Sequence, residues 1–126
     1  MRLVITKNIN KHELQVYKDI FDVKIIKEAA RKTAKGLGVS IKSSKKIKKT
    51  KLKKLYITSS SGPGRVIFLL KLKSKDVVLV MLRPKNDKKI GSNMTIDNLN
   101  FKKILDRNLD MIIQDLLDDN FYCYQL

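Results

Sequence analysis

The side chains of this 126-residue chain that could do chemistry are mainly cationic, and they gather at the ends of predicted strands. Lys53 and Lys54 enter one strand, and Arg65 opens the next, directly after Gly64. A further polar group leaves the following strand, made of Arg83, Lys85, Asn86, Lys88 and Lys89. Lysine and arginine neutralise phosphates, and arginine also binds them bidentately. The pattern therefore predicts a polyanion-binding surface, although strand order alone does not fix whether these groups converge.

The net charge supports the same interpretation. The chain carries 28 Lys and Arg against 12 Asp and Glu, a formal charge of +16. Residues 97–126 contain three basic and six acidic residues, so residues 1–96 carry a formal +19. Residues 42–54 (KSSKKIKKTKLKK) hold eight lysines and no acid. This segment is either a solvated lysine-rich loop or a surface that follows phosphates, and the overall charge favours the second reading.

Composition excludes several classes of protein. The single Cys123 rules out an internal disulfide and a cysteine-based zinc site. One histidine, His12, argues against a histidine-rich metal site or a Ser-His-Asp triad, and we expect it to be exposed. No apolar run approaches a membrane span, and the N-terminal run is too short for a signal peptide. We expect no metal, no cofactor, no membrane association and a cytoplasmic location.

The hydrophobic pattern supplies the elements that position these side chains. We expect strands at 1–6, 55–58, 65–73 and 76–82, the last two joined by a tight link. We expect helices over 10–21, opened by a capping box of Asn10 and Glu13, and from 22 to about 37. An amphipathic helix spans about 100–120. After it, Tyr122 and Tyr124 are expected to pack the helix end on the sheet.

The order β-α-α-β-β-β-α predicts one α+β domain over residues 1–126. Consecutive strands with short links give a small antiparallel sheet, and we expect the helices to pack on one side of it. Gly64 lets the backbone approach a ligand closely, and Arg65, at the start of a strand, is expected to be at least partly exposed.

Several segments at their spacing resemble the RelE/ParE toxin superfamily, particularly its RelE-like branch. They are Leu52–Tyr56, the Ser/Gly turn, Gly64-Arg65-Val66-Ile67-Phe68, and the run from Leu79 to Lys88 that ends in Pro84-Lys85-Asn86-Asp87-Lys88. The resemblance covers roughly residues 1–95 and implies a single RelE-like domain. It implies a toxin of a type II toxin–antitoxin system that inhibits translation by cleaving mRNA on the ribosome without a metal.

The resemblance also implies roles for residues. Arg65 matches the arginine that stabilises the reacting phosphate, and Lys54 matches a lysine of the RKLR motif. Lys85, Asn86 and Lys88 match the segment whose basic side chains face the RNA. Tyr56 stands where the motif ends in arginine, and Ser92 and Asn93 occupy a region where some RNase members have a tyrosine. These departures leave part of the family's mechanism unfilled.

In RNA cleavage a 2′-hydroxyl attacks the adjacent phosphate, and a fixed cation stabilises the charge that builds on its oxygens. The expected catalytic residues are Arg65, Lys54, Lys85 and Lys88. The expected RNA-binding residues are Lys53, Lys54, Arg83, Lys85, Asn86, Lys88 and Lys89. Arg65 could instead pair with an acid of the last helix, and Lys85 and Lys88 could simply solubilise a loop.

Other functions remain open. A ParE-type protein would poison DNA gyrase without cutting RNA, and a plain RNA-binding or ribosome-binding module would do neither. The partners expected from the resemblance are mRNA, the ribosome and a cognate antitoxin. The chain would be monomeric alone and hetero-oligomeric with its antitoxin, which would cover the basic face with acidic residues.

Overall fold

The computed structural model describes residues 1–41, 46–87, 90, 94 and 97–126. Its elements follow the order β1 (Arg2–Thr6), α1 (Lys7–Ile9), the π-helix η1 (Asn10–Leu14), α2 (Val23–Ala34), β2 (Val39–Ile41), β3 (Thr50–Ser59), β4 (Gly62–Lys71), β5 (Val77–Pro84), α3 (Leu99–Leu117) and β6 (Phe121–Gln125). The α+β class is confirmed. The strands form one six-stranded sheet in the order β2-β3-β4-β5-β1-β6.

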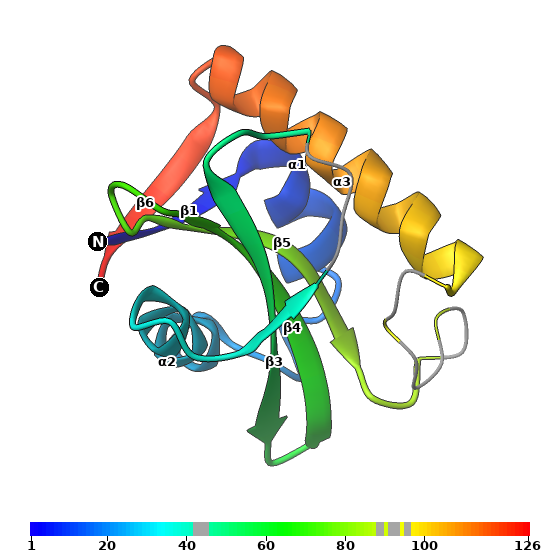
Figure 1. The fold of residues 1–126 in the computed structure, drawn as a ribbon. Helices are drawn as coiled ribbons and strands as arrows, with labels where there is room; N and C mark the ends of the chain where they lie inside the picture. The colour runs from blue at the N-terminus through cyan, green and yellow to red at the C-terminus, as the bar shows by residue number, and fades with distance from the viewer. Residues whose placement is uncertain (42–45, 88–89, 91–93, 95–96) are drawn as a thin grey trace.

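The sheet is mostly antiparallel (Figure 1). Strands β3, β4 and β5 pair as a meander, while β1 lies parallel to β5 and antiparallel to β6. The sequence prediction lacked β2 and β6. Tyr122 and Tyr124 belong to β6, paired with Ile5 and Leu3, so their expected role at the helix end is wrong. This pairing brings the two termini together, and the amide of Leu126 donates to the carbonyl of Met1.

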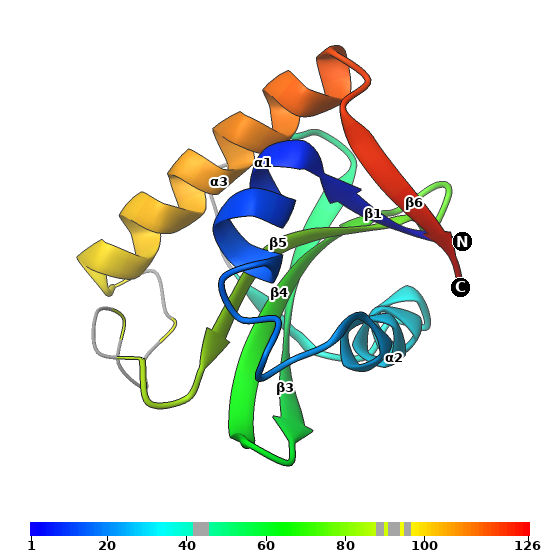
Figure 2. The same cartoon turned by 180° about the vertical axis from the view of Figure 1, so that it is seen from behind.

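Helices cover both faces of the sheet, which corrects the prediction that they pack on one side. Helix α2 packs on β3, β4 and β5, whereas α1, η1 and α3 lie against β5 and β1. Figures 1 and 2 show α2 on one side of the strands and α3 with α1 on the other. The first part of the helix predicted over 10–21 is present as η1, but turns follow it over 15–21, and there the chain passes between the faces to Asp22, the N-cap of α2.

The face under α2 is closed by apolar packing. Leu55 and Ile57 of β3 and Val66 and Leu82 beside them are buried, together with Phe21, Ile26, Ala29 and Ala30. Alanine allows a helix to approach a sheet closely, which suits the small residues of α2. The Cβ of an alanine at Gly64 would lie 2.2 Å from Cζ of Phe21. The close approach predicted at Gly64 is therefore made by a core side chain.

The lysine-rich segment is partly regular structure. Lys51, Lys53 and Lys54 lie in β3, which begins at Thr50, and residues 42–45 lie outside the described residues. The amphipathic helix is confirmed as Leu99–Leu117, with its buried stripe on β5 and β1. Asn98 caps it by accepting from the amide of Phe101.

Candidate nucleic-acid interface

The middle strands bring Tyr56, Arg65 and Arg83 into one row. Tyr56 of β3 pairs with Arg65 of β4, and Arg65 pairs in turn with Arg83 of β5. Directly paired residues of antiparallel strands point to the same face. This face is opposite to the one under α2, because the next row, containing Leu55, Val66 and Leu82, points the other way. The sheet therefore provides part of the convergence that the sequence left open.

Lysines extend this row. Lys54 lies two residues before Tyr56 on the same face, and its Nζ is 5.8 Å from the centre of the Tyr56 ring. Lys85 follows β5, and its amide donates to the carbonyl of Pro63 at 3.1 Å. We call Lys54, Tyr56, Arg65, Arg83 and Lys85 the basic strip. Lys53 alternates to the α2 face and does not belong to it.

Arg65 lies at the centre of the strip and is buried, with only 1% of its surface exposed. The expectation of a partly exposed strand-end arginine is therefore wrong. Burial lowers the pKa of the Arg65 guanidinium, and nearby Tyr56 and Asp87 act in the opposite direction. A phosphate cannot contact this guanidinium unless the covering residues move. Its charge acts from beneath the surface.

Arg83 is buried as well, and its charge is compensated. It forms an ion pair with Glu13, which is fully buried. Glu13 also accepts from the amide of Leu82 at 2.8 Å and from Nδ2 of Asn108 at 3.2 Å. The predicted capping box is thus wrong, because Glu13 reaches into the sheet interface instead. Arg83 thus links η1 to the sheet from a buried position, and its role in RNA binding stays a prediction.

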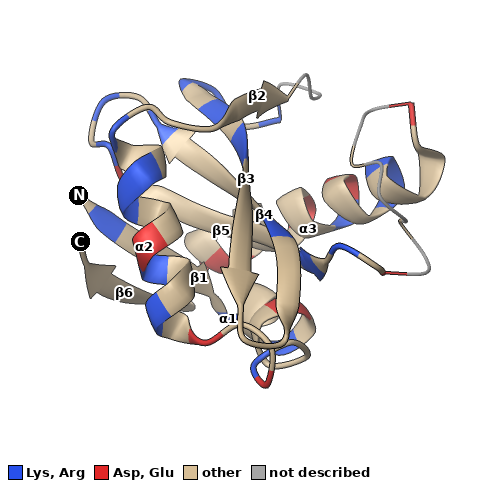
Figure 3. Cartoon of the chain, turned by 90° about the horizontal axis from the view of Figure 1, so that it is seen from below, with Lys and Arg blue, Asp and Glu red and all other residues tan. Residues whose placement is uncertain are grey.

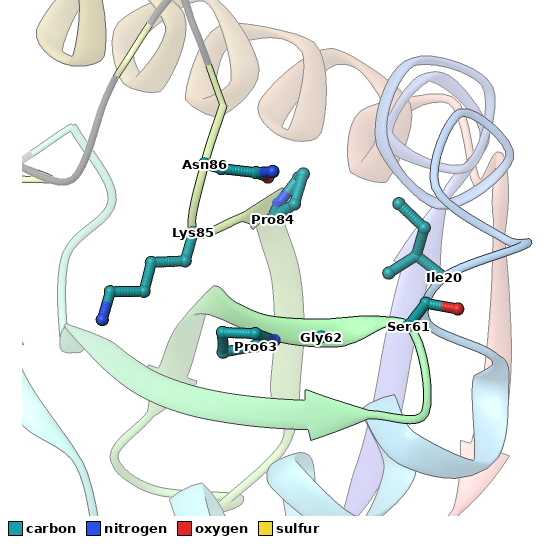
Figure 4. A pocket seen from close by; sticks show the side chains of 7 residues that line it. All are labelled: Ile20, Ser61, Gly62, Pro63, Pro84, Lys85 and Asn86. Carbon is teal, nitrogen blue, oxygen red and sulfur yellow. The ribbon is translucent and has the colours of Figure 1, made fainter.

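The accessible end of the strip borders a pocket of about 450 Å³. Its lining residues come from the β3–β4 turn, the exit of β5 and the turn before α2: Ile20, Ser61, Gly62, Pro63, Pro84, Lys85 and Asn86. Lys85 and Asn86 are exposed, and their side chains leave the backbone in opposite directions (Figure 4). The predicted site residues Lys88 and Lys89 lie outside the described residues, as do Ser92 and Asn93.

A second pocket, of about 510 Å³, was not predicted from the sequence. Its walls come from η1, the turn after it, the exit of β5 and α3, and they carry His12, Val16, Tyr17, Arg83, Asp87, Ile104 and Arg107. His12 is exposed, as expected. Arg107 was not predicted as a site residue because it lies in the acidic segment 97–126, far in sequence from the basic clusters. Only the fold brings it beside the single histidine.

Positive charge is not confined to the strip. Figure 3 shows Lys and Arg on α2, around the start of β3 and on the chain leaving β5.

In the part of the chain that the structure describes, no group of three His, Cys, Asp or Glu side chains could hold a metal ion. No helix among the described residues has the length and apolar character needed to cross a membrane. Comparison with protein-family models, curated proteins and solved structures finds no match to this chain.

Proposed function

We propose that this protein binds single-stranded RNA through the basic strip and inhibits translation by cleaving mRNA on the ribosome, as the toxin of a type II toxin–antitoxin pair. One observation carries the proposal: Lys54, Tyr56 and Lys85 lie along one end of a single sheet face, in a chain of formal charge +16. The RelE-like segments of the sequence supply the toxin assignment.

The exposed part of the strip suits a single strand. Tyr56 is a large ring that is 69% exposed, on the part of β3 that continues past its pairing with β2. Exposed rings on a sheet stack with unpaired bases, and neighbouring lysines hold the phosphates between those bases. Lys54 lies beside the ring, and Lys85 lies past the Arg83 end of the row. A strand running across β3, β4 and β5 would meet both lysines.

Cleavage at this surface would follow the route of metal-independent RNases. The 2′-oxygen forms a bond to phosphorus, the bond to the 5′-oxygen breaks, and the products are a 2′,3′-cyclic phosphate and a 5′-hydroxyl. A base takes the proton of the 2′-hydroxyl and an acid returns one to the leaving oxygen. Lys54 and Lys85 stabilise the charge on the non-bridging oxygens. Arg65 adds positive potential from below, at a distance that its burial enforces.

The toxin proposal includes an acidic antitoxin as partner and a cytoplasmic location. Twenty-eight basic residues repel one another in the free chain, so a partner that presents carboxylates to the basic strip would stabilise the protein while blocking RNA.

The test is a purified translation extract with a defined mRNA. We expect translation to stop and cleavage sites to map within ribosome-bound codons, with cyclic phosphate ends. The variant with both Lys54→Ala and Lys85→Ala should cut more slowly, whereas Lys24→Ala, an exposed lysine of α2, should cut like the parent. Intact mRNA beside inhibited DNA gyrase would replace this proposal with the ParE-type alternative.

A non-cleaving RNA-binding or ribosome-binding protein is the second candidate. The specific observation in its favour is the burial of Arg65, because the arginine that the resemblance assigns to the reacting phosphate does not reach the surface. Under this alternative the protein binds RNA through the same lysines, ribosome-bound mRNA stays intact, and gyrase is unaffected.

A further inference from the structure

We propose that the pocket between η1, the exit of β5 and α3 binds one guanine nucleotide of an RNA strand, with its phosphate at His12 and Arg107 and its base against Tyr17 and Asp87. This inference deepens the proposed function, because it adds a specific subsite beside the sequence-independent basic strip. Arg83 belongs to both, so the pocket lies where the row of Tyr56, Arg65 and Arg83 ends. Its volume of about 510 Å³ is within the usual range for small-molecule sites.

An imidazole and a guanidinium that could contact a phosphate line this pocket from different elements. His12 is exposed on η1, and Arg107 is exposed on α3. Nε and Nη2 of Arg107 donate to Oδ1 of Asn108 at 3.3 and 3.2 Å, which steadies the guanidinium. Among the described residues no carboxylate lies within ion-pair distance of Arg107. Its charge is therefore available to a phosphate, which arginine binds bidentately.

The aromatic wall is preorganised. Tyr17 is half-buried, and the guanidinium of Arg83 lies 5.3 Å from the centre of its ring. Arg83 is itself fixed by its ion pair with the buried Glu13. A ring held in this way offers a base a rigid stacking surface with little loss of conformational entropy. Burial raises the pKa of Tyr17 and outweighs the opposite effect of the Arg83 charge. The hydroxyl therefore stays protonated and can donate a hydrogen bond.

Asp87 supplies the selectivity. It is a carboxylate in an otherwise cationic pocket, and its Oδ2 accepts the amide of Ile90 at 2.9 Å. This bond fixes the side chain and leaves acceptor positions on the other oxygen. Guanine presents two neighbouring donors, N1–H and the exocyclic amine, on the edge that single-stranded RNA exposes. Adenine and the pyrimidines present an acceptor at one of the corresponding positions, so a carboxylate discriminates against them.

The test is a titration of the full chain with GMP, AMP and UMP, followed by NMR or calorimetry. We expect GMP to bind at least tenfold more tightly than AMP or UMP. Arg107→Gln should weaken GMP binding at least tenfold, and His12→Gln should weaken it less. Asp87→Asn, whose amide oxygen can still accept the amide of Ile90, should bring GMP and AMP to similar affinity. Lys102→Gln removes an exposed charge from the same helix outside the pocket and should bind GMP like the parent.

Three results would overturn the inference: no GMP binding at millimolar concentration, equal affinity for the three nucleotides, or Arg107→Gln binding like the parent. Thermal melting of every variant shows whether a loss of binding reflects a loss of folding. Binding of a uridine-only RNA, measured in parallel, separates this inference from the proposed function. If that RNA binds through Lys54 and Lys85 but GMP does not bind, only the guanine pocket is wrong. If GMP binds but RNA does not, the proposed function is wrong.

Discussion

The two faces of the central sheet are covered by different kinds of side chain, apolar on one face and charged on the other. Under α2 the contacts are made by Leu55, Ile57 and Val66 against alanines and Phe21, all of them buried and apolar. On the opposite face the next row of the same strands carries Tyr56, Arg65 and Arg83. There η1 contributes Glu13, which pairs with Arg83, and α3 contributes Asn108, which donates to Glu13.

The difference shows that the charged face is not a requirement of the sheet. An apolar row would pack at least as well, because buried ion pairs are often no more stabilising than hydrophobic residues of similar volume. Charged residues appear on the face that continues into the half-buried Lys54 and the exposed Lys85, and they are absent from the centre of the α2 face. We infer that the first face is organised around a polyanionic ligand and the second around stability.

The largest expected effect comes from breaking the charged network. Glu13→Ala should cost about 3–5 kcal/mol, because it leaves the Arg83 guanidinium buried without its carboxylate. The matched control is Glu28→Ala on α2, whose ion pair with Arg31 is exposed and should contribute no more than about 0.5 kcal/mol. Urea unfolding measures both variants. Equal costs for the two glutamates would contradict the contrast between the faces.

On the apolar face the corresponding change is steric. Gly64→Ala places a Cβ 2.2 Å from Cζ of Phe21 and 2.9 Å from the carbonyl of Arg83, so we expect a loss of about 1–3 kcal/mol. Adding Phe21→Leu should recover part of it by opening space, which a double-mutant cycle will measure. Independent, additive losses would show that the two residues do not share the packing described here.

A substitution at Arg65, unlike the two above, is expected to leave the free energy of unfolding unchanged or to raise it. Arg65→Met replaces a guanidinium whose charged form is penalised by burial with an apolar side chain of similar length, so stability should stay within about 1 kcal/mol of the parent or rise. RNA cleavage, if the proposal holds, should fall. A loss of several kcal/mol on unfolding would assign Arg65 to the scaffold alone.

The smallest expected effect is that of removing one lysine of the basic strip. Lys54→Ala and Lys85→Ala should each weaken RNA binding a few-fold and lower the slope of log K against log salt by ~0.7. Lys24→Ala on α2 should leave the slope unchanged. If all three lysines contribute equally, the charge acts as a diffuse field and the strip has no special status.

Periodicity and turn residues predicted much of the fold. The stripe of α3, the meander of β3 to β5 and the helix beginning at Asp22 all follow from local patterns that packing only reinforces. The strand β6 was not predicted, because the edge pairing of Phe121–Gln125 with β1 depends on a partner more than a hundred residues away. The placement of α2 and α3 on opposite faces of the sheet was not predicted either, because an amphipathic stripe does not indicate which face of the sheet the helix covers.

The sequence predicted which charged residues belong to the candidate site, but not which of them are buried. Lys54 and Lys85 lie at the surface, or partly so, as their positions in the sequence indicate. The burial of Arg83 depends on Glu13, which is far away in sequence and reads locally as a helix cap, and the burial of Arg65 has no signal in its own segment. Arg107 meets His12 only because α3 crosses the face beside η1. Such long-range pairings are invisible to composition and spacing.

The most direct test of the proposed RNA-binding face is ultraviolet cross-linking of the protein to single-stranded RNA, with mass spectrometry of the modified peptides. The chain offers two matched tyrosines: Tyr56 in the basic strip is 69% exposed, and Tyr122 on the edge strand β6 is 56% exposed. We predict cross-links at Tyr56 that disappear in the Lys54→Ala, Lys85→Ala double variant, with none at Tyr122. Cross-links at Tyr122 with Tyr56 unmodified would contradict the assignment of the RNA to this face of the sheet.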